Sequence, residues 1–307
     1  MTVKIVTDSS VDLTAELAKE YGITIVPAYV HFGTETFYDG VTISPDEAYR
    51  RLVTGSVRPT TSQATPADFA RYYEQLGKDA EDIISIHFSH KFSGTFGSAQ
   101  QGAKQAETKC RITIIDSNTV SMALGIICMS AARLAQQGKK MPEITADIDD
   151  SMKNTHLMAT LDTLKYLALG GRIGKAKALL GSVLNVKPIV TVRDGELVPS
   201  GNVRTRAKAI EKLYEYAAGT PDIKEIAVVH NTTPDEACAL RDRFVGLVPA
   251  NRLHVTKFGP AMGIHTGPGT LVVAVRDSGA KAAAAESAAK TEDKKSLLHL
   301  PKLRHQV

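Results

Sequence analysis

The chain has 307 residues, 43% of them hydrophobic, and carries a formal net charge of +4 at neutral pH. This composition is typical of a globular protein, and the length suits about two domains. Basic and acidic residues nearly balance before residue 278, so no concentrated basic face for binding nucleic acid is predicted.

In the first half of the chain, short apolar runs rich in Ile and Val alternate with helical patterns. Buried strands are predicted at residues 3–8, 24–32, 83–89 and 111–116. Ser44-Pro45 and Thr65-Pro66 each combine a hydroxyl N-cap with proline at the first helical position, which predicts helices over 45–53 and 66–76. Strands that alternate with helices predict a largely parallel sheet.

The pattern changes after a helical segment at residues 144–154. Residues 186–201 place an Asp-Gly turn between two extended arms, which predicts a hairpin. Residues 254–275 read as two strands that flank the sequence GIHTGPGT.

We therefore predict an α/β protein with a parallel-sheet N-terminal domain (1–152) and a mixed-sheet α+β C-terminal domain (153–277). The last segment, 278–307, is rich in Ala and Lys and is expected to be a flexible tail. Its end, LLHLPKLRHQV, combines four leucines with two cations and raises the hypothesis of a transient membrane contact. Disorder is the alternative, because Pro301 interrupts any helix there.

Four polar stretches lie where elements meet: TDSSVDL (7–13), RPTTSQATP (58–66), SHKFSGTFGSA (89–99) and IDSNTVS (115–121). The carboxyl ends of parallel strands share one edge of a sheet, where ligands bind, and helix N-termini there favour anions. The hydroxyls of Thr61 and Ser93 are candidate donors to an oxyanion. Simple helix capping is the alternative for each loop.

His265 precedes Gly267-Pro268-Gly269, which predicts a constrained loop that holds the imidazole in one orientation. The alternative is a histidine with only a structural hydrogen bond.

Several other kinds of site are not indicated. The segment GGRIGKAKALL (170–180) departs from the phosphate-loop pattern, and no G-x-S-x-G elbow surrounds Ser93. Three scattered cysteines without CxxC spacing predict neither disulfides nor a zinc site, and no metal or cofactor motif is present. The start of the chain lacks a signal-like apolar region, and the most apolar segment, 121–138, is too short to span a membrane. A cytoplasmic protein is expected.

A series of ordered motifs resembles the DegV family throughout residues 3–276. The motifs are TDSS-x-DL, PTTSQ, SGT, IDS, YL-x-x-GGRI, KPI, RT-x-x-KA and H-T-G-P-G. This resemblance implies two α/β domains with a buried tunnel between them that binds one long-chain fatty acid. It also implies a carrier without its own catalysis, similar to the subunits that present a fatty-acid carboxylate to an ATP-dependent kinase subunit for acyl-phosphate formation.

The resemblance places the carboxylate contacts on Thr61, Ser93 and His265. The neighbours Ser62, Gly94 and Thr266 are expected to support them. Hydrogen bonds alone, without a salt bridge, would stabilise the carboxylate while leaving it transferable. The preceding His90-Lys91-Phe92 departs from the common family pattern, and Phe92 is expected to narrow the tunnel.

Two arginines are candidates for docking the kinase. Arg172 of GGRI and Arg204 of the RT motif follow turns rather than lying inside strands, and the resemblance implies a kinase-facing role for Arg204. The alternative is that each arginine forms a weak surface ion pair.

A hydrolase or acyltransferase that uses Ser93 with His265 is the competing functional hypothesis. A serine nucleophile needs a base that a third group orients, and the sequence identifies no acid to orient His265.

Overall fold

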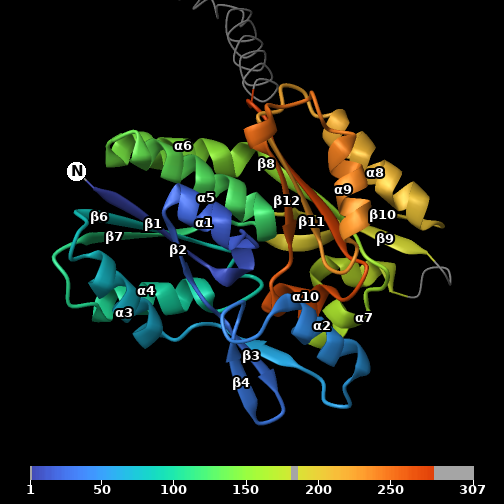
Figure 1. Ribbon diagram of the computed structural model, residues 1–307, viewed down its shortest axis with the longest axis horizontal. Helices are drawn as coiled ribbons and strands as arrows, with labels where there is room; N and C mark the ends of the chain where they lie inside the picture. Colours follow the sequence, from blue (N-terminus) through green and yellow to red (C-terminus); the bar gives the residue numbers. More distant parts are fainter. Residues whose placement is uncertain (1, 181–185, 280–307) are drawn as a thin grey trace, which may run out of the picture.

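The computed structural model describes residues 2–180 and 186–279 (Figure 1). Its strands are β1 Val3–Asp8, β2 Ile23–Val26, β3 Tyr29–Phe32, β4 Glu35–Tyr38, β5 Thr60–Ser62, β6 Asp82–His87, β7 Arg111–Asp116, β8 Thr155–Thr160, β9 Lys187–Arg193, β10 Glu196–Val203, β11 Glu225–His230, β12 Leu253–Lys257 and β13 Leu271–Arg276.

The α-helices are α1 Ala15–Tyr21, α2 Pro45–Thr54, α3 Pro66–Leu76, α4 Thr95–Gln105, α5 Ser121–Gln136, α6 Met141–Asn154, α7 Lys165–Gly170, α8 Arg206–Ala218, α9 Pro234–Asp242 and α10 Pro260–Thr266. Short 3-10 turns occur at η1 Ser9–Val11, η2 Gly174–Leu179 and η3 Ala250–Arg252.

The N-terminal sheet is parallel throughout, with the strand order β2-β1-β6-β7. Helices α3 and α4 cover one face, and α1 and α5 cover the other (Figure 1). Strand β6 is buried along its whole length, as a doubly covered parallel strand should be. The predicted parallel sheet is confirmed.

The two helix starts predicted from Ser-Pro and Thr-Pro pairs are also confirmed. The hydroxyl of Ser44 accepts a hydrogen bond from the amide of Glu47 at the start of α2. Thr65 and Asp68 form a reciprocal capping box at the start of α3.

The single strand predicted over residues 24–32 is wrong. Strand β2 ends at Val26, and β3 belongs to a separate antiparallel sheet with the order β4-β3-β5. Pro27 lacks the amide hydrogen that a central strand needs. The amide of Ala28 bonds the hydroxyl of Ser9 instead of a neighbouring strand, so the chain leaves the parallel sheet there.

The C-terminal sheet has the strand order β10-β9-β8-β13-β11-β12 and is mixed, as predicted. Strands β11 and β12 pair in parallel, whereas the other neighbours are antiparallel. Asp194 and Gly195 both have positive φ angles, 50° and 74°, at the turn of the predicted β9–β10 hairpin.

Helix α5 packs against strands of both large sheets, and one buried apolar cluster therefore continues from one half of the molecule into the other. Helix α6 ends at Asn154 and β8 begins at Thr155, near the predicted division of the chain. Of the predicted tail, residues 280–307 lie outside the described part.

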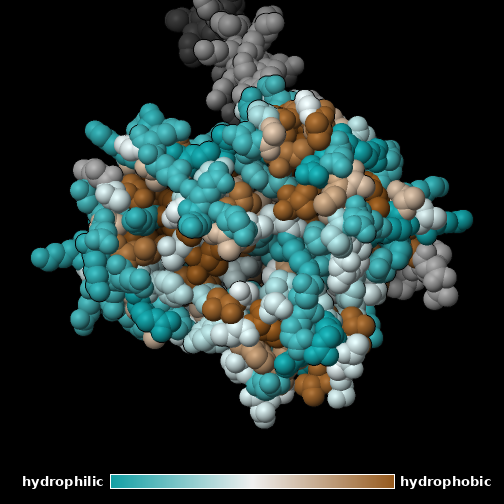
Figure 2. All heavy atoms as spheres, viewed as in Figure 1, coloured by the Kyte–Doolittle hydropathy of each residue, from teal (hydrophilic) through white to brown (hydrophobic). Residues whose placement is uncertain are grey.

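The face in Figure 2 is mainly hydrophilic, with apolar residues in separate patches. Within the described ranges, no helix has both the length and the apolar character needed to cross a membrane.

Candidate functional site

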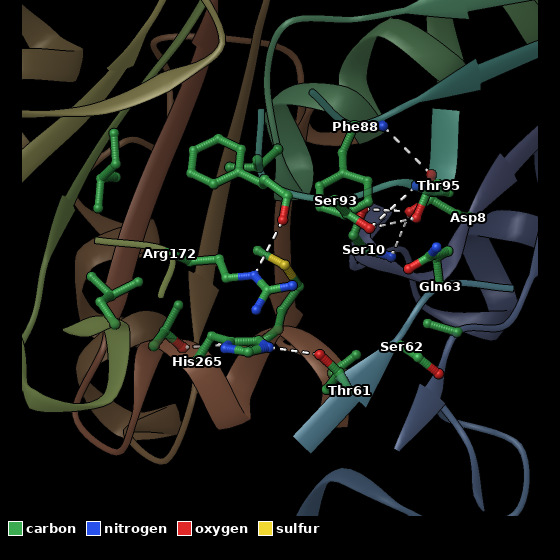
Figure 3. Close-up of a pocket in the computed structure, with 18 residues that line it drawn as sticks. Asp8, Ser10, Thr61, Ser62, Gln63, Phe88, Ser93, Thr95, Arg172 and His265 are labelled. Carbon is green, nitrogen blue, oxygen red and sulfur yellow. Dashed lines mark hydrogen bonds between the residues drawn. The ribbon is translucent and has the colours of Figure 1, made fainter. Parts of the chain in front are cut away.

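A mostly apolar cavity of about 120 Å³ lies where the two halves of the molecule meet. Its wall comes from both halves, and polar side chains of both halves lie among the apolar ones (Figure 3). The polar lining residues are Asp8, Ser10, Thr61, Ser62, Gln63, Ser93, Thr95, Arg172, His265 and Thr266. Thr61, Ser93 and His265, the residues predicted to contact the fatty-acid carboxylate head group, thus line one cavity.

Thr61 and His265 are in direct contact. The Thr61 hydroxyl lies 2.7 Å from Nε2 of His265. Thr61 belongs to strand β5, where it pairs with Val30, and His265 lies in the last turn of helix α10. The prediction of a loop position is therefore wrong for both residues. The predicted glycines instead follow the helix, with positive φ angles at Gly267 and Gly269.

His265 is electrically neutral at physiological pH. Burial, together with the nearby Arg172 and Arg58 guanidinium groups, lowers its pKa to about 4. A neutral imidazole has one donor and one acceptor nitrogen. Nε2 is engaged by Thr61, whereas Nδ1 is buried without a hydrogen-bond partner in the described part of the chain.

The end of helix α7 lies against the His265 ring. A Cβ atom added to Gly170 would lie only 2.2 Å from Nδ1 of His265. The first glycine of the GGRI motif thus makes room for the imidazole, and the second, Gly171, ends α7 in the left-handed region. The rest of 170–180 forms η2 rather than the strand-loop-helix of a phosphate loop.

Arg172 also lines the cavity. Its Nε donates to the Phe92 carbonyl at 3.2 Å, and its Nη1 donates to the Gly170 carbonyl at 2.7 Å. The structure thus differs from the expectation of a head-group site without a cation, because a guanidinium lies beside the histidine (Figure 3). Phe92, which was expected to narrow the tunnel, is part of the wall.

Ser93 lines the same cavity, but its hydroxyl is directed toward helix α4. It lies 3.0 Å from the Thr95 hydroxyl and accepts the Thr95 amide at 3.2 Å. Gly94 is the N-cap of α4 and packs closely against the Gln63 amide.

The other two supporting residues make local hydrogen bonds. Ser62 lies 2.9 Å from Nε2 of His31, and the Thr266 hydroxyl donates to the Met262 carbonyl.

A buried chain of hydrogen-bonded polar side chains, which begins at Asp8 in the cavity wall, was not predicted from the sequence. Asp8 accepts the Ser10 amide and contacts Nδ1 of His87 at 2.8 Å. His87 then contacts the Ser85 hydroxyl, which also accepts from Tyr73. Ser85 and His87 alternate with apolar residues along β6, and this alternation was the available signal. It does not reveal that His87 contacts Asp8, which lies 79 positions away.

This geometry disfavours the serine-enzyme hypothesis. The Ser93 hydroxyl bonds Thr95, His265 bonds Thr61, and no carboxylate among the described residues orients Nδ1 of His265. Ser85, His87 and Asp8 have the connectivity of a triad, yet Ser85 is fully buried and its hydroxyl is bonded to Tyr73.

A second cavity, of about 530 Å³, shares Thr61, Arg172 and His265 with the first. Arg58, Lys165 and Arg172 line it, and its lining contains no carboxylate. Arg204 is elsewhere, exposed after β10, and forms no ion pair within the described residues. No group of three or more candidate metal ligands occurs among them either.

Comparisons with known proteins agree with the fold and with the shared motifs. A family model described as "Uncharacterised protein, DegV family" matches residues 2–277. A DegV domain-containing protein of Streptomyces coelicolor is 39% identical over 280 residues, which are 89% of this chain and 98% of that protein.

Two solved structures share the fold over the whole length of their chains. A structure described as fatty acid binding of a DegV family protein from Thermus thermophilus has a TM-score of 0.83 and 32% identity, covering 90% of this chain and 100% of that one. DegV of Bacillus subtilis, described as a fatty acid binding protein, has a TM-score of 0.81 and 29% identity, covering 91% and 100%. On this evidence, the chain belongs to the DegV family.

Proposed function

We propose that this protein binds a long-chain fatty acid in the cavity and presents its carboxylate to an ATP-dependent kinase partner. The observation that carries the proposal is a mostly apolar cavity whose wall includes the Thr61 and Ser93 hydroxyls, the His265 imidazole and the Arg172 guanidinium. The family members from Thermus thermophilus and Bacillus subtilis, described as fatty acid binding, support the ligand class.

The carboxylate would bind at the hydroxyls of Thr61 and Ser93, with His265 orienting the Thr61 hydroxyl toward it. Because His265 is neutral, Nε2–H can donate to the Thr61 oxygen, which leaves the Thr61 hydroxyl hydrogen free for the ligand. Ser93 would supply a second hydroxyl by turning away from Thr95. Arg172 adds a positive charge beside the head group, and its carbonyl partners hold it in place.

The acyl chain would continue into a smaller, mostly apolar compartment of about 50 Å³. The two compartments share the wall residues Val120, Leu167, Leu197, Met262 and Thr266. Each buried methylene contributes about 0.8 kcal/mol, so the chain supplies affinity and the polar side chains supply orientation.

The transfer step would occur in the partner. Thr61 and His265 line the second cavity as well as the first, so a partner seated in the second cavity would reach the carboxylate without displacing the acyl chain. Neither Ser93 nor His265 has the contacts of a nucleophile-base pair, which favours a carrier over the hydrolase alternative.

The test is native mass spectrometry and fatty-acid titration of the wild type and of the Thr61→Val/Ser93→Ala double variant. Each lost hydrogen bond to a charged group costs about 1.5–3 kcal/mol, so the double variant, which loses two, should bind roughly a hundredfold more weakly or worse. Thr60→Val is the matched control for fatty-acid binding, since Thr60 is exposed on the same strand and lines the second cavity but not the first. Wild-type protein that takes up no fatty acid would refute the proposal.

A further inference from the structure

Helix α10, which carries His265, has only seven residues. An isolated helix of this length is unstable in water, because nucleation costs more than so few hydrogen bonds return. The position of His265 therefore depends on what holds the ends of α10. Side chains from distant segments bond both ends.

The C-terminal end is held from within the C-terminal half. Nδ2 of Asn231 donates to the carbonyl of Gly267 at 2.6 Å and to that of Gly263 at 3.3 Å. The Thr270 hydroxyl donates to the carbonyls of Thr266 and Gly267. These bonds satisfy carbonyl groups that a helix end leaves unpaired.

The N-terminal end is held from the other half of the molecule. Oδ1 of Asp12 accepts the Gly259 amide at 2.9 Å, and Oδ1 of Asp39 accepts the Ala261 amide at 3.0 Å. The Tyr49 hydroxyl donates to the Phe258 carbonyl at 2.7 Å. Helix α10 thus bridges the two halves through its caps.

Both carboxyl groups are buried at a cost. Asp12 and Asp39 are 5% and 3% exposed, and the Oδ2 atom of each lacks a hydrogen-bond partner among the described residues. Burial raises the pKa of both, that of Asp39 to about 6. Burying carboxyl groups this deeply is expensive, and a well-packed apolar pair would stabilise the same contact at least as well.

The two carboxyl groups also approach the same point of the chain. A Cβ atom added to Gly259 would lie 3.3 Å from Oδ1 of Asp39 and 3.7 Å from Oδ1 of Asp12. Both carboxyl groups therefore lie against the start of the helix.

We propose that Asp12 and Asp39 are positioning residues of the head-group site, because they fix helix α10 and thereby hold Nε2 of His265 against Thr61. The part of the proposal that concerns ligand affinity rests on the proposed fatty-acid binding. The part that concerns the histidine does not.

The test compares removal of each carboxyl group with its conservative replacement. Asp39→Ala removes the acceptor, whereas Asp39→Asn keeps a side-chain oxygen for the Ala261 amide. Asp12→Gly is used for removal at the other position, because Asp12 has a φ of 53° that glycine adopts without strain. Asp12→Asn is its conservative partner, since asparagine also tolerates this conformation.

Two readouts separate positioning from general stability. The first is the NMR signals of the His265 ring and the Thr61 side chain in ligand-free protein well below the melting temperature. The second is fatty-acid affinity. Removal variants should shift the His265 signals and bind at least roughly tenfold more weakly, whereas the asparagine variants should stay within about twofold of wild type.

Asp82→Ala is the matched control. Asp82 is an equally buried carboxylate of the N-terminal half, but it pairs with Arg111 and does not contact α10. It should lower the melting temperature and leave the His265 signals unchanged. Unchanged His265 signals in Asp39→Ala and Asp12→Gly, or equal changes in Asp82→Ala, would overturn the proposal. A wild type without fatty-acid affinity but with shifted His265 signals in the removal variants would instead refute only the proposed ligand.

Discussion

Thr61 and His265 are 204 positions apart in the chain and are joined by a hydrogen bond of 2.7 Å. One residue comes from a three-stranded sheet of the N-terminal half and the other from a short helix of the C-terminal half. The proposed carboxylate site at Thr61 and His265 therefore requires that the two halves be packed together. Substitutions that move strand β5 or helix α10 should disturb it.

Gly170→Ala should displace the His265 ring. The added Cβ would lie 2.2 Å from Nδ1, far inside contact distance. We expect the Thr61–His265 hydrogen bond to break and fatty-acid affinity to fall about tenfold, the cost of about one such bond. Isothermal titration measures the change. Gly97→Ala is the control, because nothing lies within 4 Å of a Cβ there, and normal binding by Gly170→Ala would contradict the packing described.

The neutral state of His265 should make folding weaker in acid. The folded protein takes up this proton only near pH 4, whereas the unfolded chain does so near the ordinary pKa of 6.5. The contribution of neutral His265 to the free energy of unfolding is thus fully present above pH 6.5. It is lost as the pH falls to 4 and amounts to up to about 3 kcal/mol. Urea denaturation of wild type and His265→Gln between these pH values checks this. An NMR titration midpoint near 6.5 for His265 would contradict it.

Titration of Asp39 should change the free energy of unfolding with pH in the opposite direction. Burial and the nearby Asp8 raise its pKa from 3.8 to about 6. The unfolded chain loses this proton first, so the contribution of Asp39 is present below pH 3.8 and is lost as the pH rises to 6.

Asp39→Asn has no charge to bury and should therefore be more stable than wild type at pH 8, by up to about 3 kcal/mol, and equal to it at pH 3.5. Denaturant midpoints at the two pH values are the measurement. Equal midpoints at pH 8 would show that the buried carboxyl group carries no such penalty.

Alanine substitution should have different effects at Arg204 and at Arg206, although they are two residues apart. Arg204 is exposed, whereas Arg206 binds Glu236 and the Gly269 carbonyl. Arg204→Ala should keep its melting temperature and fatty acid but lose most acyl-phosphate formation with the kinase partner, by the 2 kcal/mol or more of an interface hot spot.

Arg206→Ala should instead lower the melting temperature, since it leaves Glu236 without its partner. Full acyl-phosphate formation by Arg204→Ala at limiting protein concentration would place the docking surface elsewhere.

Much of the fold was predictable because the signals are local. The Thr65-Pro66 start of α3 and the Asp-Gly turn of the β9–β10 hairpin depend on residues within one turn of the chain. The error over residues 24–32 arose because apolar β-branched residues suit either sheet, and Pro27 alone marks the change.

The candidate site was predictable only as a set of residues. Motifs pointed to Thr61, Ser93 and His265, which line one cavity. They did not reveal that His265 lies on a helix, nor that Arg172 lies in the cavity wall, because both depend on how α7 and α10 pack.

The sequence by itself determined strands β1, β6 and β7, the starts of α2 and α3, the β9–β10 hairpin and the family, since periodicity, capping, turn residues and short motifs are read along the chain. Only the tertiary structure decided which hydroxyl meets His265 and which carboxyl groups hold its helix. Asp12 lies 247 positions from Gly259, and Asp39 lies 222 from Ala261. Contacts at such separations are set by the paths of the intervening backbone and by burial, which no local pattern encodes.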